Sequence, residues 1–310
     1  MNESRQNFFS AADSMSPWST SASNVSISAI SESTSDWLAA VWIILLVVGA
    51  LLYALLMIQR SPYSMWENVL YVPTLLYGRL IWRVHFANRP PEAIEGGAVL
   101  VANHHSSVDP FFVQLAAGRR VHWMVAREYC DAPGVGSFLQ ALQVIPTNRS
   151  GMDTGATKQA IRLAKEGRLV GMFPEGRLNH TVRDPLLSIR PGAALVAMRA
   201  GVPLIPLYIF GSPYRREVWS PLIMAAHVKI TFGQPIDPRN FAEQNTPLLD
   251  PADESSPAEN ADKPRQSELI LAEQMILEWG KRIATMAGKS DWKVEIAGRS
   301  RLTRTTKENS

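Results

Sequence analysis

Two residues that could act as a general base and its partner, His104 and Asp109, lie five positions apart directly after the apolar run Ala98–Ala102. On one continuous helix these two positions would be about 140° apart and would not face each other. Their side chains can therefore pair only if His104 lies in a loop and Asp109 lies at the start of the next helix. An ionised Asp109 would then bind one ring nitrogen of His104 and leave the other nitrogen free to accept a proton from an alcohol.

Other interpretations of the same stretch remain open. Ser106-x-x-Asp109 matches a capping box, and Asp109 is followed by proline, so its carboxylate could serve only as a helix cap. Ser106 or Ser107 could belong to a Ser/His/Asp hydrolase, although the glycine-flanked elbow of such a nucleophile is missing. No metal site is indicated, because the sequence lacks a His-Glu-x-x-His pattern and a second acidic or histidine cluster nearby. His105 and His122 are interpreted as structural or surface residues.

Three further motifs follow apolar runs. In FPEGR, residues 173–177, proline and glycine predict a tight turn from which Glu175 and Arg177 project over one crevice. In QVIPTNR the closing residue is Arg149, and two arginines could clamp a phosphate monoester, because guanidinium binds phosphate in a bidentate manner. Taken alone, Arg149 could equally be a solvated surface residue. VPLIP, residues 202–206, is an apolar strand bracketed by prolines, which suits either the core or the edge of a groove.

From Gly96 onward the chain alternates apolar, strand-like runs with helical segments. This alternation predicts an α/β fold with a largely parallel central sheet flanked by helices. In such sheets the polar residues that follow the strands converge on a ligand crevice, and both NHHSSVD and FPEGR occupy that position. The predicted strands are Ala98–Ala102, Val121–Ala126, Leu169–Phe173, Val202–Ile209 and Val228–Phe232, and the predicted helices are Thr154–Glu166, Pro191–Ala200 and Ser267–Ala287.

Composition limits the kind of protein. The 310 residues, 46% hydrophobic and 19% charged, suit one globular domain of about 200 residues with appendages. A single cysteine, Cys130, excludes an internal disulfide framework and a cysteine-rich zinc module. A net charge of +3 is too weak to indicate nucleic acid binding but suits an anionic membrane surface or a phosphate-bearing substrate.

The N-terminal quarter predicts a membrane protein. Residues 1–36 form a serine-rich tail expected to be disordered, and residues 37–58 are an uncharged apolar stretch long enough to span a bilayer. Arg5 precedes this stretch, whereas several arginines follow it, so the positive-inside rule places the C-terminal domain in the cytoplasm. Residues 59–89 contain a mixed aromatic and aliphatic helix, Met65–Phe86, which could lie at the membrane interface or pack on the domain.

The remaining boundaries follow from composition. Residues 90–240 are predicted to form the catalytic domain. Residues 241–266, rich in Pro, Ser, Glu and Asp, are predicted to be a flexible acidic insertion. Residues 267–310 are predicted to be a C-terminal helix and a basic tail.

The four motifs occur in an order that resembles the glycerolipid acyltransferase family, whose best-known member is 1-acyl-sn-glycerol-3-phosphate acyltransferase. The resemblance covers about residues 90–235. The second family motif, Gly-x-Ile-x-x-x-Arg, differs here because Gln143 replaces its glycine. The first motif, Asn-His-x-Ser-x-x-Asp, is matched by Asn103, His104, Ser106 and Asp109; the third, Phe-Pro-Glu-Gly with Arg directly after it, by Phe173, Pro174, Glu175, Gly176 and Arg177; and the fourth, Val-Pro-x-x-Pro, by Val202, Pro203 and Pro206.

The resemblance implies acyl transfer from acyl-CoA or an acyl-carrier-protein thioester to the hydroxyl of lysophosphatidic acid, with no metal or organic cofactor. His104 would be the base and Asp109 its partner. The expected partners are the lysophospholipid acceptor, the thioester donor and the lipid bilayer, with no nucleic acid. Another lysophospholipid or glycerol phosphate as acceptor, a lipid hydrolase and a catalytically silent membrane scaffold are the alternatives. The residues implied in substrate binding are Arg149, Glu175, Gly176, Arg177, Asn103 and Ser106.

Overall fold

The computed structural model divides the chain into two compact units, Met1–Leu56 and Met57–Ser310. Several stretches for which the sequence makes predictions lie outside the described residues: most of the tail before residue 27, Arg149, most of the acidic insertion and the basic C-terminal tail. The structure describes residues 27–60, 63, 65–148, 153–181, 183–215, 219–245 and 263–298.

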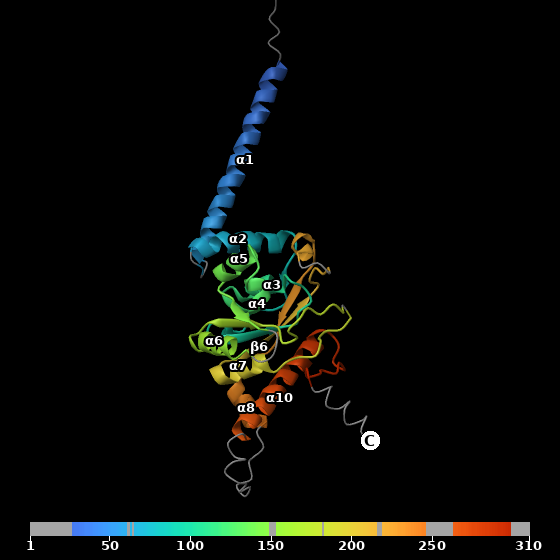
Figure 1. Cartoon of the computed structure of the whole chain (residues 1–310). Coiled ribbons are helices and arrows are strands. Elements are labelled where there is room, and N and C mark those ends of the chain that lie inside the picture. Colours follow the sequence, from blue (N-terminus) through green and yellow to red (C-terminus); the bar gives the residue numbers. More distant parts are fainter. Residues whose placement is uncertain are drawn as a thin grey trace, which may run out of the picture. The chain divides into compact units, whose positions relative to one another are not determined.

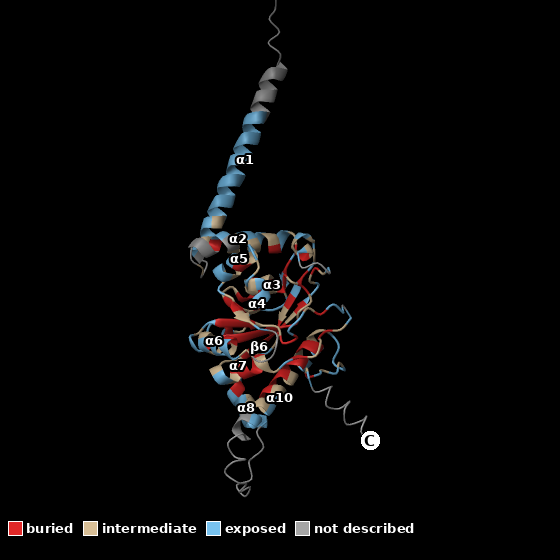
Figure 2. Ribbon diagram, viewed as in Figure 1, coloured by how far each residue is buried: buried red, intermediate tan, exposed pale blue. Residues whose placement is uncertain are grey.

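The described part of the first unit is the helix α1, Ile27–Arg60, whose last residues belong to the second unit. Its segment Asp36–Leu56 has a mean hydropathy of 2.7 and none of its residues is buried, so by length and composition it could cross a membrane. Figure 2 shows this segment exposed along its length. The helix begins earlier than the predicted span. Residues 27–36 are helical, so their assignment to the disordered tail was wrong. Once the apolar stretch is helical, each further residue adds a hydrogen bond without a new nucleation step.

The second unit is built on one mixed sheet. Within the described residues seven strands lie in the order β1-β7-β6-β2-β5-β3-β4, and all neighbours are parallel except β6 and β7. Figure 1 shows helices on both sides of this sheet, with α2 and α3 above it and α7 and α10 below it. The predicted α/β fold with a largely parallel sheet is therefore confirmed. The strands are β1 His85–Phe86, β2 Ala98–Ala102, β3 Val121–Ala126, β4 Ile145–Thr147, β5 Leu169–Met172, β6 Leu204–Phe210 and β7 Lys229–Phe232.

Helices cover both faces of this sheet because the central strands are apolar on both sides. In the fully buried β2, Val99 and Val101 pack into one hydrophobic cluster, with helices α6, α7 and α10. Leu100 points to the other face, where it packs with α3 and with Trp82, just after α2. The helices of the second unit are α2 Met65–Leu80, α3 Asp109–Ala117, α4 Arg127–Cys130, α5 Val135–Ala141, α6 Thr154–Lys165, α7 Gly192–Ala200, α8 Pro238–Asn245 and α10 Lys263–Met286, with 3-10 turns η1 Glu92–Ile94 and η2 Ser220–Ile223.

Helix α2 ends at Leu80, earlier than predicted, and His85–Phe86 forms strand β1 against β7. The chain leaves the helix through Arg83, whose φ of 43° lies in the left-handed region. Two short strands, β1 and β4, were not predicted, since two or three residues are too few to show a strand period.

The structure confirms that α2 packs on the domain, one of its two predicted roles, and the membrane-interface role stays a prediction. Tyr71 and Leu75 pack against the hydrophobic cluster around α3, so one face of α2 lies on the domain. The opposite face is also apolar, and its residues are exposed at the i, i+4, i+7 and i+11 spacing of one helical stripe. This exposed stripe consists of Val69, Pro73, Leu76 and Leu80.

The predicted acidic insertion, residues 241–266, is shorter at both ends than expected. Phe241–Asn245 forms the last part of α8, and residues 263–266 begin α10. The composition of residues 241–266 changes gradually, so it marks no sharp helix boundary. The segment between these helices lies outside the described residues.

Two adjacent glycines before β2 provide a test of this packing. A Cβ on Gly97 would lie 2.0 Å from the carbonyl oxygen of Ala164 at the end of α6, whereas a Cβ on Gly96 would meet nothing within 4 Å. We expect Gly97→Ala to lower the free energy of unfolding by about 1–3 kcal/mol, because β2 or α6 must shift. The matched Gly96→Ala should leave it within about 0.5 kcal/mol of the original. Urea unfolding of the detergent-solubilised chain measures both, and equal midpoints would contradict this close contact.

Candidate active site

The ends of three neighbouring strands bring the candidate residues together. β2 lies between β6 and β5, and all three run in the same direction. Their carboxyl ends therefore meet at one edge of the sheet, as expected for a ligand crevice. The segment Asn103–Asp109, called the His104 loop below, follows β2, the FPEGR turn follows β5, and Gly211 and Ser212 follow β6.

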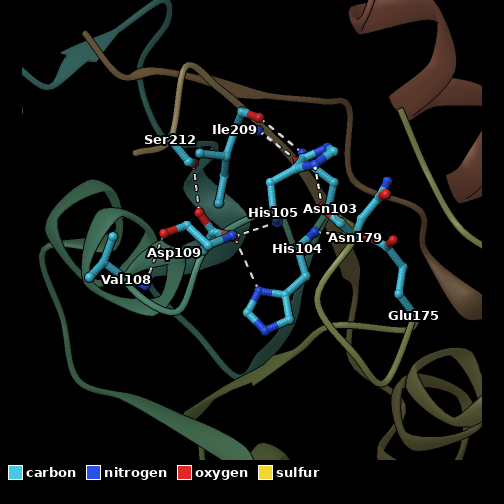
Figure 3. Close-up of polar contacts among 10 residues, drawn as sticks. Asn103, His104, His105, Val108, Asp109, Glu175, Asn179, Ile209 and Ser212 are labelled. Carbon is cyan, nitrogen blue, oxygen red and sulfur yellow. Dashed lines mark hydrogen bonds and ion pairs between the residues drawn. The ribbon is translucent and has the colours of Figure 1, made fainter. Parts of the chain in front are cut away.

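The predicted pairing of His104 with Asp109 is present. Nδ1 of His104 lies 3.1 Å from Oδ2 of Asp109, as Figure 3 shows. Asp109 is the first residue of α3 and has no exposed surface, whereas the His104 side chain is 17% exposed. The loop and the helix thus supply the change in backbone direction that a continuous helix could not. Since an ionised Asp109 can only accept, Nδ1 of His104 carries the proton.

Asp109 accepts four hydrogen bonds. Its Oδ2 also accepts the backbone N–H groups of His105 and Ser106, each at 2.7 Å. Its Oδ1 accepts the hydroxyl of Ser212 at 2.6 Å. These donors and the N-terminus of α3 compensate a carboxylate that is removed from water. The capping interpretation is confirmed only in part. Val108 is the N-cap of α3 and makes no side-chain cap hydrogen bond, whereas the N–H group of Ser106 is bound by Asp109 as in one half of a capping box.

Aromatic stacking fixes the plane of the His104 ring. The ring lies parallel to Phe173, with centroids 3.9 Å apart and planes 10° apart. Phe173 in turn stacks on Trp123 of β3 at 4.8 Å. Within the part of the chain that the structure describes, no hydrogen bond involves Nε2 of His104. The ring is thus held through Nδ1 and through stacking on one face, and Nε2 has no hydrogen-bond partner among the described residues.

Glu175 holds the backbone of the His104 loop. This carboxylate is 4% exposed and accepts the N–H groups of His104 at 2.8 Å and of Leu187 at 2.9 Å. Burial raises the pKa of Glu175 from 4.5 to about 7. On the other side, the N–H group of Asn179 donates to the carbonyl oxygen of His104 at 2.7 Å. The peptide groups on both sides of the His104 Cα are therefore fixed by the segment that follows β5.

The expectation that Glu175 and Arg177 project over the same crevice is wrong. Glu175 is buried, whereas Gly176 and Arg177 are exposed. Gly176 has a φ of +66° and its N–H group donates to the carbonyl oxygen of Phe173 at 3.1 Å, which closes a tight turn. This reversal directs the neighbouring side chains apart, and the two backbone N–H groups draw the carboxylate inward.

Asn103 and Ser106 also take structural positions. The Asn103 side chain is fully buried and makes two hydrogen bonds with the backbone of Ile209, at 2.9 and 2.8 Å. It thereby extends the pairing of β2 with β6 by one residue. Ser106 is 1% exposed, and its Oγ lies 3.4 Å from the N–H group of Val108. A substrate-binding role for either residue stays a prediction.

The structure explains the departure from the second motif. Gln143 has a φ of 53°, the left-handed conformation that glycine adopts most easily. Its carbonyl oxygen is bound by Nδ1 of His122 at 2.9 Å, and His122 is 4% exposed. His122 is thus a structural residue, as predicted, and burial lowers its pKa. The chain then enters β4, and Arg149, which closes the motif, lies just beyond the described residues.

Two residues of the site were not predicted. Ser212 binds Asp109, and Asn179, which is 1% exposed, binds the backbone of His104. The rule that strand ends converge could have indicated Ser212, since it lies two residues after β6. Nothing in the sequence around Asn179 marks it, because its contact is made by a backbone N–H group. Among the described residues, no group of three or more His, Cys, Asp or Glu side chains could hold a metal ion.

The chain is similar in sequence to known acyltransferases. The chain is 28% identical over 151 residues to a 1-acyl-sn-glycerol-3-phosphate acyltransferase of Bacillus subtilis, covering 48% of this chain and 71% of that protein. It is 30% identical to the chloroplastic enzyme of that name from Arabidopsis thaliana, over 37% of this chain and 32% of the plant protein. A crystal structure of a 1-acyl-sn-glycerophosphate acyltransferase from Thermotoga maritima aligns with a TM-score of 0.44 and 21% identity, covering 77% of this chain and 92% of that chain.

The family model described as Acyltransferase matches residues 82–210. This range begins before β1 and ends with β6, so it contains the His104 loop and the FPEGR turn. The matched range ends two residues before Ser212. The part of the chain that carries the His104 loop and the FPEGR turn is thus the part that resembles the acyltransferase family.

Proposed function

We propose that this protein transfers a fatty acyl group from an acyl thioester to the hydroxyl of lysophosphatidic acid and so forms phosphatidic acid. The observation that carries the proposal is the His104–Asp109 pair, which leaves Nε2 of His104 without a partner among the described residues. The similarity to 1-acyl-sn-glycerol-3-phosphate acyltransferases supports the choice of acceptor. The donor, either acyl-CoA or an acyl-carrier-protein thioester, is part of the proposal. The aligned region spans 71% of the Bacillus protein but only 32% of the Arabidopsis protein.

The geometry suits direct transfer. Nε2 of His104 takes the proton of the acceptor hydroxyl as its oxygen attacks the thioester carbonyl carbon. The C–O bond forms, the C–S bond breaks and the thiolate leaves without needing an acid. Asp109 stabilises the imidazolium through Nδ1. General-base catalysis of this kind contributes about 10²–10⁴-fold to the rate.

The serine hydrolase alternative fits the structure less well. Ser106 is buried, and its hydroxyl lies against the N–H group of Val108. The ring nitrogen of His104 that faces Asp109, at the start of α3, is Nδ1 and not Nε2. A nucleophilic serine needs a base within hydrogen-bond reach, and no hydrogen bond between Ser106 and His104 occurs in the described structure.

We place the reaction at a membrane surface. Helix α1 supplies the candidate span, and the exposed stripe of α2 supplies a second apolar surface. Residues of η2 adjoin α2, because the hydroxyl of Tyr77 donates to the carbonyl oxygen of Leu222. There Ile223 is 84% exposed and Trp219 is 61% exposed. Since arginines follow the span and Arg5 alone precedes it, the catalytic domain belongs on the cytoplasmic side.

The phosphate of the acceptor requires cations near the strand ends. Arg177 is exposed in the turn that carries Glu175, whose carboxylate binds the backbone of His104. We propose that Arg177 and Arg149 bind this phosphate in a bidentate manner. Glu175, whose oxygens both accept backbone N–H groups, acts instead by holding the loop.

We expect His104→Ala to lower acyl transfer by about 10²–10⁴-fold, because the acceptor hydroxyl loses its base. Thiol release from acyl-CoA with lysophosphatidic acid, measured on membranes containing the full chain, checks this. Ser106→Ala should retain part of the activity, and Ser188→Ala, outside the site, should match the original chain. Near-normal transfer by His104→Ala would contradict the assignment of the base, and complete loss in Ser106→Ala would favour the hydrolase.

The raised pKa of Glu175 makes stability depend on pH. Between the unfolded value of 4.5 and the folded value of about 7, the folded chain keeps a proton that the unfolded chain releases. Stability should therefore fall as pH rises through this window, by about 3 kcal/mol in total for this one group. Glu175→Gln cannot titrate, so its unfolding midpoint should change less over the same range. Chemical unfolding at a series of pH values compares the two, and parallel profiles would contradict the prediction.

A further inference from the structure

The carboxylate of Asp109 also accepts a hydrogen bond from outside the His104 loop. We infer that Ser212 is a positioning residue for the proposed acyl transfer: its hydroxyl holds Oδ1 of Asp109 so that Oδ2 stays against the His104 ring. The inference rests on the proposed function, since it takes His104 as the base. The family match ends at residue 210, so it does not include Ser212.

The distribution of donors on Asp109 supports this role. Three donors reach Oδ2, and all three come from the His104 loop: the ring of His104 and the N–H groups of His105 and Ser106. Oδ1 receives the Ser212 hydroxyl at 2.6 Å (Figure 3). In the described structure Ser212 is the one residue outside the loop that donates to this carboxylate. A carboxylate held at both oxygens cannot rotate about its Cβ–Cγ bond, so Oδ2 keeps its direction.

The backbone turn after β6 places the Ser212 hydroxyl against Asp109. Gly211 has a φ of +79°, and a Cβ there would lie 2.1 Å from the carbonyl oxygen of His227. Only glycine fits this position, because the two segments of backbone touch. The turn at Gly211 brings Ser212 to Asp109, while Ile209, at the end of β6, binds the side chain of Asn103. Both ends of the His104 loop are thus attached to the end of β6.

Loss of the hydroxyl should change the proton affinity of His104 in a defined direction. Without Ser212, Oδ1 keeps its negative charge in a buried place with one donor fewer. The carboxylate then attracts the proton on the imidazole more strongly, so the acid limb of the rate profile should move to higher pH. The titratable groups near Asp109 are His104 and His105 in the loop and Glu175 from the turn after β5. His105 and Glu175 are unchanged by the substitution, so the difference between variant and original reports the His104–Asp109 pair.

The experiment compares Ser212→Ala and Ser212→Thr in the full chain in phospholipid vesicles, with Ser188→Ala as the control. kcat and kcat/KM for acyl-CoA are measured between about pH 5 and 9, with saturating lysophosphatidic acid. Ser212→Ala should lower kcat about tenfold and move the acid limb of kcat/KM to higher pH. Ser212→Thr keeps the hydroxyl and should retain both the rate within about threefold and the position of the limb. An unchanged rate and limb in Ser212→Ala would overturn the inference.

A second pair of variants covers the case in which Ser212→Ala fails to fold. Ser212→Thr and Ser212→Val have the same shape and differ by the hydroxyl. If both lose activity equally and the acid limb stays in place, the role of Ser212 is only structural and the inference is wrong.

An NMR titration of 13C-labelled histidine separates this inference from the proposed function. If the original chain releases no thiol, the proposed function fails, but the pKa of His104 can still be compared between the original chain and Ser212→Ala. A higher pKa in Ser212→Ala supports the anchoring role, and an equal pKa overturns it.

Discussion

The site depends on one buried negative charge. Asp109 has no exposed surface, and an ionised carboxylate in such a place is unfavourable unless donors replace the water it has lost. Two backbone N–H groups, a hydroxyl and an imidazole provide these donors, and the N-terminus of α3 adds its dipole. Because the charge is held in this way, it can fix the tautomer and direction of His104. Removing any one donor leaves the others to hold a charge that water cannot reach.

The sheet explains why these donors meet. β2 is the central strand of the three that reach the site, with β6 on one side and β5 on the other. The loop after β2 is tied to the end of β6 through Asn103 and Asp109, and to the turn after β5 through its bonds with Glu175 and Asn179. His104 lies between the two attachments. A general base needs this restraint, since transfer without a covalent intermediate requires one orientation of the imidazole towards both substrates.

Much of this arrangement could be predicted from local pattern. The apolar runs predicted β2, β3, β5, β6 and β7 to within a few residues, and the period of helices predicted α6, α7 and α10. The break in direction between His104 and Asp109 followed from their spacing, because five positions on one helix would separate them. The strand-end rule then placed the FPEGR turn beside the His104 loop, as the structure shows.

The remaining features depend on contacts between distant segments. The sequence does not show that Glu175 turns inward, because its partners are backbone N–H groups of His104 and Leu187. Ser212 was not predicted because a glycine and a serine after a strand are common in any loop. Gln143 keeps a glycine-like conformation that its side chain type does not favour, and its bond with His122 shows the tertiary contact that supports it. A phosphate clamp at Arg149 stays a prediction.

The tautomer of His104 tests the central claim most directly. Nitrogen-15 NMR of histidine-labelled protein above the pKa of His104 distinguishes a protonated from an unprotonated ring nitrogen, and a His104→Gln sample assigns the signal. We expect the proton on Nδ1 and a bare Nε2, because Asp109 holds Nδ1 and accepts only. A neutral His104 with its proton on Nε2 would contradict the account, since that nitrogen could not then take a proton from an acceptor hydroxyl.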